Sequence, residues 1–161
     1  MPCILGVHSG GNQLFCVAVI IPHTIAPAPM GSVLPLPSVE SARALIDTGA
    51  TGTCISQRHA QKINLQPIGK RTVHGVSGVA AHNSYVFKIG FPFDVPAGIP
   101  LPPGMPPMPP GGRATQLHVV EKIIQGSEFK TGGNFDILLG MDVISIGSLV
   151  VLGNGSFCFS F

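Results

Sequence analysis

Prolines and glycines divide this chain into apolar segments that are too short for long helices. The 161 residues include 21 Gly and 16 Pro, with a single Tyr and no Trp. Proline breaks helices and is excluded from the centre of a sheet, so regular structure must form between the prolines. Charged residues make up 10% of the chain, against about 25% in a typical domain. We therefore expect a mainly β fold built as one domain over residues 1–161, with 45% apolar content to supply its core.

Apolar runs between these breaks predict the elements of the domain. We expect strands over four runs, at 13–22, 42–46, 114–124 and 137–139. Glycines 75 and 78, set among β-prone residues, predict a hairpin over 70–91 with its tip near Val76 and Ser77. Asn154 and Gly155 predict a tight turn into a last strand.

Two short helices and two long loops complete the expected organisation. Ser56 is a suitable N-cap for a helix over 57–64, and a one-turn helix is expected after Gly140. Pro-rich loops at about 22–38 and 92–112 contain too many prolines for central strands. Their composition predicts extended, polyproline-type chain.

The charge pattern argues against nucleic acid and membrane partners. Nine basic residues are scattered singly apart from Lys70-Arg71, without interleaved aromatic residues. The apolar run Leu14 to Pro22 lacks the basic residues that precede a signal-peptide core, and it is about half the ~20 residues that span a bilayer. Cys3, Cys16, Cys54 and Cys158 show no zinc-ligand spacing, which favours free thiols in a reducing compartment. We therefore expect a cytoplasmic protein.

The six histidines do not form a metal-binding pattern. They stand at 8, 23, 59, 74, 82 and 118, with no H-x-x-x-H and no Cys/His cluster. The sequence predicts no metal and no cofactor.

The stretch "ALIDTGATGTCIS", residues 44–56, places Asp47 at the end of an apolar strand. Burial at such a position raises the pKa of a carboxyl group unless hydrogen bonds compensate. Gly49 allows a tight turn that brings N–H groups towards the carboxylate, and the Thr48 hydroxyl can tie the turn to a neighbour. A tripeptide of this kind is also common in ordinary Asx-turns and helix caps, so this stretch alone leaves both readings open.

A second apolar motif, "FDILLGMDVI", follows about ninety residues downstream. The two motifs in this order resemble the retropepsin-like aspartic proteases, in particular bacterial single-lobe members and the Ddi-type retroviral-like domain. The resemblance implies a single-lobe, closed-barrel-like fold in which Asp47 is catalytic, supported by Thr48, Gly49 and Ala50. It implies that Ile137, Leu138, Leu139 and Gly140 cross beneath the catalytic loop. It also implies that a flap closes over substrate, formed by Val73, His74, Gly75, Val76, Ser77, Gly78 and Val79.

The resemblance also implies a homodimer. Aspartic proteolysis uses two carboxylates that share one proton, and this chain carries one "DTG". Two carboxylates ~3 Å apart repel by roughly 5 kcal/mol at an effective dielectric of ~20, which favours the singly protonated pair. Each of two chains must then supply an Asp47, on a two-fold axis.

Two other carboxylates lie in the second motif. Asp142 could be imagined as a partner for Asp47 within one chain, but it is better explained as the N-cap of the following helix or as a structural hydrogen-bond acceptor. Asp136 is expected to end a turn. Neither is predicted to be catalytic.

The sequence thus predicts an aspartic endopeptidase that acts on polypeptides as a homodimer. The alternative is a catalytically silent, dimeric peptide-binding or interaction module of the same fold, because a fold does not determine its function. A third possibility is that the protein cleaves its own precursor.

Overall fold

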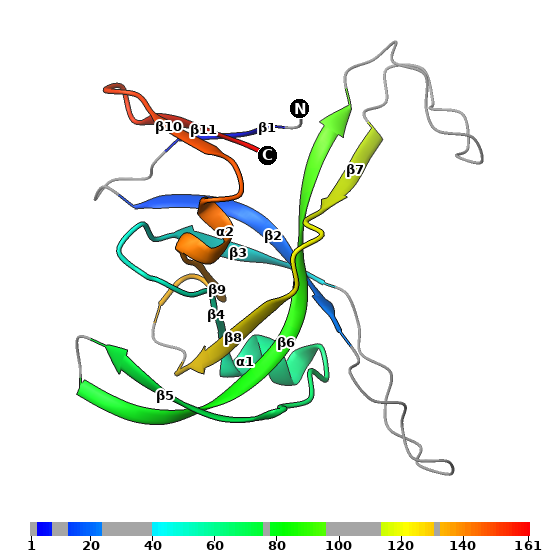
Figure 1. Ribbon diagram of the computed structural model, residues 1–161. Helices are drawn as coiled ribbons and strands as arrows, with labels where there is room; N and C mark the ends of the chain where they lie inside the picture. The colour runs from blue at the N-terminus through cyan, green and yellow to red at the C-terminus, as the bar shows by residue number, and fades with distance from the viewer. Residues whose placement is uncertain (1–2, 8–12, 24–39, 76–77, 96–113, 131–132) are drawn as a thin grey trace.

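The computed structural model describes residues 3–7, 13–23, 40–75, 78–95, 114–130 and 133–161. Within these ranges the chain forms eleven strands and two short helices, α1 and α2 (Figure 1). The predicted mainly β fold is confirmed.

Eight strands form one sheet that closes on itself. Its order is β2-β3-β9-β4-β8-β6-β5, with β7 also paired to β6. A further pairing joins β2, the first strand of this order, to β6, the last but one. Closure depends on the length of β6, which pairs with β5, β8, β2 and β7 in succession. The strands are β2 Leu14–Pro22, β3 Ser41–Ile46, β4 Cys54–Ser56, β5 Gly69–Gly75, β6 Gly78–Val95, β7 Ala114–Val119, β8 Ile124–Phe129 and β9 Ile137–Leu139.

The core lies inside this closed sheet. Every second residue of β3 is buried, and the residues between them are exposed or half-buried. The buried residues Ala42, Ala44 and Ile46 therefore point inward. Phe87 and Phe91 on β6 are fully buried on the same side. Each buried side chain of this size contributes roughly 1.5–3 kcal/mol to folding relative to its exposure to water.

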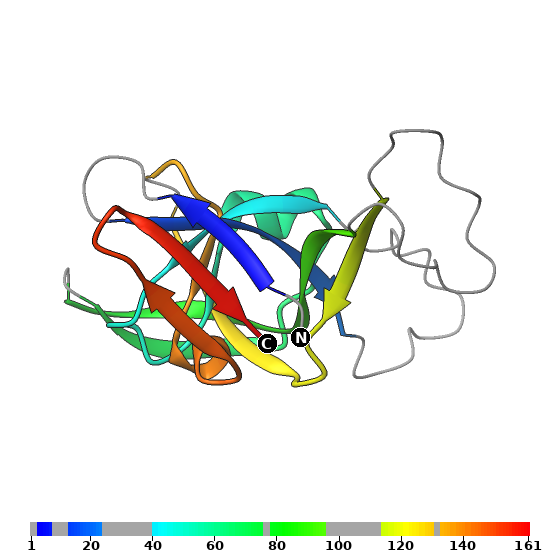
Figure 2. The ribbon, with the colours of Figure 1, turned by 90° about the horizontal axis from the view of Figure 1, so that it is seen from above.

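A separate three-stranded sheet has β11 (Ser156–Ser160) between β1 (Cys3–Val7) and β10 (Ser148–Val151). Figure 2 shows these blue, red and orange strands side by side. Phe157 and Phe159 of β11 are buried and join the main core. The predicted turn before β11 is present: Gly155 has φ 84°, and the Asn154 side chain accepts the N–H of Ser156 at 3.0 Å.

Helix α1 (Gln57–Lys62) begins where the sequence predicts. The Ser56 hydroxyl accepts the N–H of His59 at 3.0 Å, and Asn64, with φ 54°, follows the end of the helix. Helix α2 (Met141–Ile144) is a single turn after Gly140. Neither helix, nor any other in the described part of the chain, is long and apolar enough to span a membrane.

The predicted bounds of the Pro-rich loops are partly wrong. Residues 92–95 continue β6, with Pro92 opposite Leu117 of β7, and Pro22 ends β2. The pairing of β6 with β2 stops at Gly90, so beyond it β6 has β7 as its one paired neighbour among the described strands. Such an edge tolerates a residue without an N–H. Residues 24–38 and 96–112 of the two predicted loops lie outside the described ranges.

Candidate active site

Asp47 is held in a tight turn at the end of β3. Its N–H donates to the carbonyl of Leu139 at 3.0 Å, which extends the parallel β3–β9 pairing by one residue. The N–H of Gly49 then donates to Asp47 Oδ1 at 2.9 Å, and the N–H of Ala50 donates to the Asp47 carbonyl at 3.2 Å. This is the geometry of an Asx-turn, and it aims a half-buried carboxylate away from the core with one oxygen already hydrogen-bonded.

The second motif lies directly against this turn. The N–H of Met141 donates to the carbonyl of Ala50 at 2.8 Å. A Cβ atom on Gly140 would lie 2.5 Å from the carbonyl carbon of Gly52, so this approach of two backbones requires glycine. β9 runs between β3 and β4, and Ile137 and Leu139 are fully buried. The structure thus brings together Asp47 and all four residues of the segment 137–140.

Thr53 and Asp142 fasten the two motifs to each other. The Thr53 N–H donates to Asp142 Oδ2 at 3.0 Å, and its hydroxyl donates to Oδ1 at 2.7 Å. The same hydroxyl accepts the N–H of Gly140 at 3.1 Å. Of the two roles predicted for Asp142, the structural acceptor is correct. The N-cap is wrong, because Gly140 occupies that position and no side chain caps the helix.

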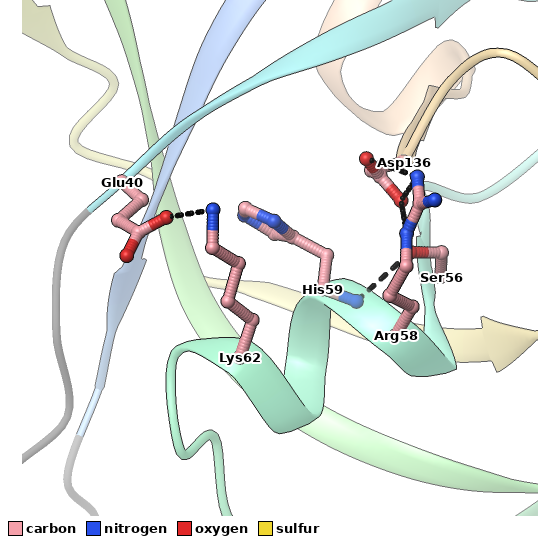
Figure 3. Close-up of polar contacts among 6 residues, drawn as sticks. All are labelled: Glu40, Ser56, Arg58, His59, Lys62 and Asp136. Carbon is pink, nitrogen blue, oxygen red and sulfur yellow. Dashed lines mark hydrogen bonds and ion pairs between the residues drawn. The ribbon is translucent and has the colours of Figure 1, made fainter.

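Asp136 has a larger structural role than the turn predicted for it. Its Oδ1 accepts the Ser56 hydroxyl at 2.6 Å, and its two oxygens accept Arg58 Nη2 at 2.7 and 2.8 Å (Figure 3). Partial burial acts to raise the pKa of Asp136, but the hydrogen bonds from Ser56 and Arg58 outweigh it and hold that pKa below its usual value. This pair fixes the start of β9 to the start of α1. No local sequence pattern indicates it, because its partners are far apart in the chain.

The predicted hairpin is formed by β5 and β6, which pair from Gly69–Ser84 to Gly75–Gly78. Val73 is half-buried, whereas His74, Gly75, Gly78 and Val79 are exposed. Val76 and Ser77, the predicted tip, lie outside the described residues. The arms are long enough to extend beyond the pairing of β6 with β8, as Figure 1 shows.

An open pocket of about 450 Å³ lies beside the Asp47 turn. Thr48 contributes to its wall, and so do Ile46 of β3 and several residues at the β10 end of the three-stranded sheet. Val151 and Leu152, on its rim, are each 53% exposed. Exposed apolar side chains therefore adjoin the exposed Thr48 side of the turn.

His59 is buried, and its Nε2 has no hydrogen-bond partner within the described structure. It lies between the Arg58–Asp136 pair and an ion pair of Lys62 with Glu40 (Figure 3). Burial lowers the pKa of His59. Among the residues that the structure describes, no three His, Cys, Asp or Glu side chains lie close enough to bind a metal.

Comparison with known proteins finds a family model and a solved structure that resemble this chain. A family model described as "Aspartyl protease" matches residues 39–89, which contain the Asp47 turn, α1 and the hairpin arms. A retropepsin-like aspartic protease from Rickettsia conorii, known from a crystal structure, is similar over 98% of this chain and 90% of its own, with a TM-score of 0.50 and 12% identity. The chain has a retropepsin-like fold. No curated protein matches the sequence significantly.

The retropepsin-like resemblance and the fold expected from it are confirmed. The finer likeness to Ddi-type domains stays a prediction.

Proposed function

We propose that this protein is an aspartic endopeptidase whose active site forms between two copies of the chain. The observation that carries the proposal is the Asp47 turn, in which a single half-exposed carboxylate is held by the Gly49 N–H and backed by Gly140. One carboxylate cannot supply both the base and the acid that peptide hydrolysis needs. A second Asp47 from an identical chain provides the missing group.

The two carboxylates divide the chemistry. Their repulsion, roughly 5 kcal/mol at ~3 Å, keeps one proton on the pair, as the general behaviour of aspartic proteases illustrates. The ionised Asp47 removes a proton from water, which attacks the scissile carbonyl carbon. The protonated Asp47 gives its proton to the carbonyl oxygen, which leaves a gem-diol. The gem-diol then collapses: the C–N bond breaks, the departing nitrogen takes the proton that the first Asp47 removed from water, and the second Asp47 takes a hydroxyl proton of the diol. The products are a carboxylic acid and an amine, and the pair again carries one proton. The Gly49 N–H at 2.9 Å holds each carboxylate in place before substrate binds.

The surface around Thr48 supports assembly on this side of the molecule. Thr48 is exposed and adjoins the open pocket whose rim includes the exposed side chains of Val151 and Leu152. A second copy related by a two-fold axis near Thr48 would cover this surface with the same surface of its own chain. In that arrangement Thr48 braces the pair of turns across the axis, while Gly49 and Ala50 shape the floor of the site.

The β5–β6 hairpin is proposed to act as the flap. Its arms are exposed on both faces near the tip, and the strand pairing continues to Gly75 and Gly78. An extended peptide held between the hairpin and the Asp47 pair would form strand-like contacts with it. Residues 73–79 would then contribute to substrate binding.

Replacement of the acid tests this function. Wild-type protein should cleave a denatured protein or a peptide library, and a statine-type transition-state mimic should inhibit it. Asp47→Asn should lower kcat by at least about 100-fold, with Glu121→Gln, an exposed carboxylate, as the matched control. Cleavage that survives Asp47→Asn would overturn the assignment. Binding of peptides without cleavage by the wild-type protein would support the silent module instead.

A further inference from the structure

Arg71 of the hairpin lies on one defined face of the closed sheet. Four paired residues connect β4 to the hairpin. Cys54 of β4 is opposite Ser127 of β8, and Ser127 is opposite Ser84 of β6. Ser84 is in turn opposite Gly69 of β5. Directly opposed residues point to the same side of a sheet, and so do residues two apart on one strand. Arg71, two residues after Gly69, therefore lies on the same face as Cys54.

The Asp47 turn belongs to this face as well. Cys54 is opposite Leu138 of β9, which is opposite Leu45 of β3. Asp47 follows Leu45 by two residues. The other face carries the apolar core residues such as Ile46, so Asp47, Cys54 and Arg71 share the face opposite to the core.

The charges of Asp47 and Arg71 both reach Cys54. Burial is the main cause that raises the pKa of the half-buried Cys54 thiol. The Asp142 and Asp47 carboxylates act in the same direction, whereas a backbone hydrogen bond at Ser127 and the Arg71 guanidinium act to lower that pKa. Both charged groups, Asp47 and Arg71, therefore lie near enough to the thiol to act on it.

Arg71 has no carboxylate partner among the described residues. The two ion pairs there use Asp136 with Arg58 and Glu40 with Lys62. The carboxylate nearest to the hairpin in the strand order, Glu128, accepts the Tyr85 hydroxyl at 2.9 Å and the N–H of Asn83 at 3.3 Å. The described arms of the hairpin, 69–75 and 78–84, contain no acidic residue.

We infer that Arg71 is a specificity-determining residue that binds an acidic side chain of the peptide substrate. The inference rests on the proposed function, since it deepens the description of the same site. An exposed, uncompensated guanidinium binds a carboxylate through two parallel N–H···O bonds, an interaction stronger and more directional than a neutral hydrogen bond. A Glu or Asp that lies under the hairpin between Arg71 and Asp47 meets that requirement.

The two-fold symmetry sharpens the expected substrate. Each chain contributes one Arg71, so the two guanidinium groups lie on opposite sides of the scissile bond. Peptides with an acidic residue on either side of the cut should be preferred, and peptides with one on each side should be preferred most. Side chains alternate along an extended peptide, so the preference should apply to alternate positions.

A scan with matched peptides tests this inference separately from catalysis. Short synthetic peptides carry Glu or Gln at each position in turn, and their binding to the Asp47→Asn protein is measured by fluorescence anisotropy. Their cleavage by protein with intact Asp47 is measured in parallel. At one or more positions Glu should bind about tenfold more tightly than Gln. Arg71→Gln should abolish this ratio, whereas Arg71→Lys should retain part of it.

Lys70→Gln is the matched control, because Lys70 is the neighbouring exposed base and lies on the opposite face, across from Asn83. It should leave the Glu-to-Gln ratio unchanged. If the Glu-to-Gln ratio is the same with Arg71 and with Arg71→Gln, in binding and in cleavage, the inference is overturned. The proposed protease function then still stands, because the protein with intact Asp47 still cleaves. If Arg71→Gln abolishes the Glu-to-Gln binding ratio but the protein with intact Asp47 cleaves no peptide, the inference is supported and the proposed function is overturned.

Discussion

Thr53 and Asp142 are joined by two hydrogen bonds, at 3.0 and 2.7 Å, although 89 residues separate them in the chain. Thr53 ends the loop that begins at Asp47, and Asp142 lies in the first turn of α2. The contact therefore fixes the far end of the candidate catalytic loop, where Gly140 packs against Gly52, while the Met141 N–H donates to the carbonyl of Ala50 in its middle. Residues remote in sequence determine where the acid is held.

Loss of the Asp142 carboxylate should destabilise the protein. Asp142→Ala leaves the N–H and the hydroxyl of Thr53 without their acceptors, and we expect a loss of about 3 kcal/mol in the free energy of unfolding. Urea denaturation at a fixed protein concentration measures it. Glu121→Ala removes an exposed carboxylate instead and should change the same quantity by less than about 0.5 kcal/mol. Equal effects of the two substitutions would refute the role given to Asp142.

Gly140 should not tolerate a side chain. In Gly140→Ala the new Cβ would lie 2.5–2.8 Å from the backbone of Gly52, which a rigid pair of loops cannot relieve cheaply. We expect a loss of about 2 kcal/mol or more in stability, read from the urea midpoint. Gly153→Ala, where no atom lies within 4 Å of the new Cβ, is the control. A midpoint equal to that of the control would show that the two loops are not packed as described.

The Arg58–Asp136 pair should stabilise the fold in a pH-dependent way. The folded-state pKa of Asp136 is lowered, so its stabilising contribution is present above the unfolded value of about 3.8 and is lost as pH falls through the folded-state pKa. Asp136→Asn should therefore destabilise the protein more at pH 6 than near pH 3. Arg58 is 61% exposed, and high salt should weaken the effect. A stability difference that does not change with pH would contradict this assignment.

His59 should make the fold sensitive to mild acid. Burial lowers its pKa, although the Asp136 and Glu40 carboxylates act against this shift and the Lys62 and Arg58 cations add to it. The unfolded chain binds the proton more readily than the folded chain does. The contribution of neutral His59 to the free energy of unfolding is therefore fully present above pH 6.5, and it is lost as pH falls from there towards the folded-state pKa. His59→Leu should reduce the loss between pH 7.5 and pH 5.5 in urea denaturation. His74→Gln, on the exposed hairpin, should leave it as in the wild type.

Elements with local signals were predictable from the sequence. The Ser56 cap needs only the N–H of His59, and the turn at Asn154 and Gly155 needs only its own backbone and the adjacent Ser156. The Asp47 turn likewise closes through Gly49, two residues away. These features form from neighbouring residues, so composition and order indicate them directly.

The remaining features depend on distant partners. Strand β8 carries Gly126, Ser127 and Glu128, which have little strand character, and it is a strand because β4 and β6 flank it. Strand β1 forms against β11 at the other end of the chain. The bonds of Asp136 to Arg58 and of Asp142 to Thr53 span 78 and 89 residues. No periodicity within a short window reports such pairs.

The central claim, that two chains build one active site, is tested most directly by a mixed dimer. Wild-type and Asp47→Asn chains with different tags are co-expressed, and the dimer that carries both tags is purified and assayed on peptides. Because each site needs one Asp47 from each chain, we expect kcat to fall by at least about 100-fold relative to the wild-type dimer. A mixed dimer with half the wild-type activity would show that each chain acts alone and would contradict the account.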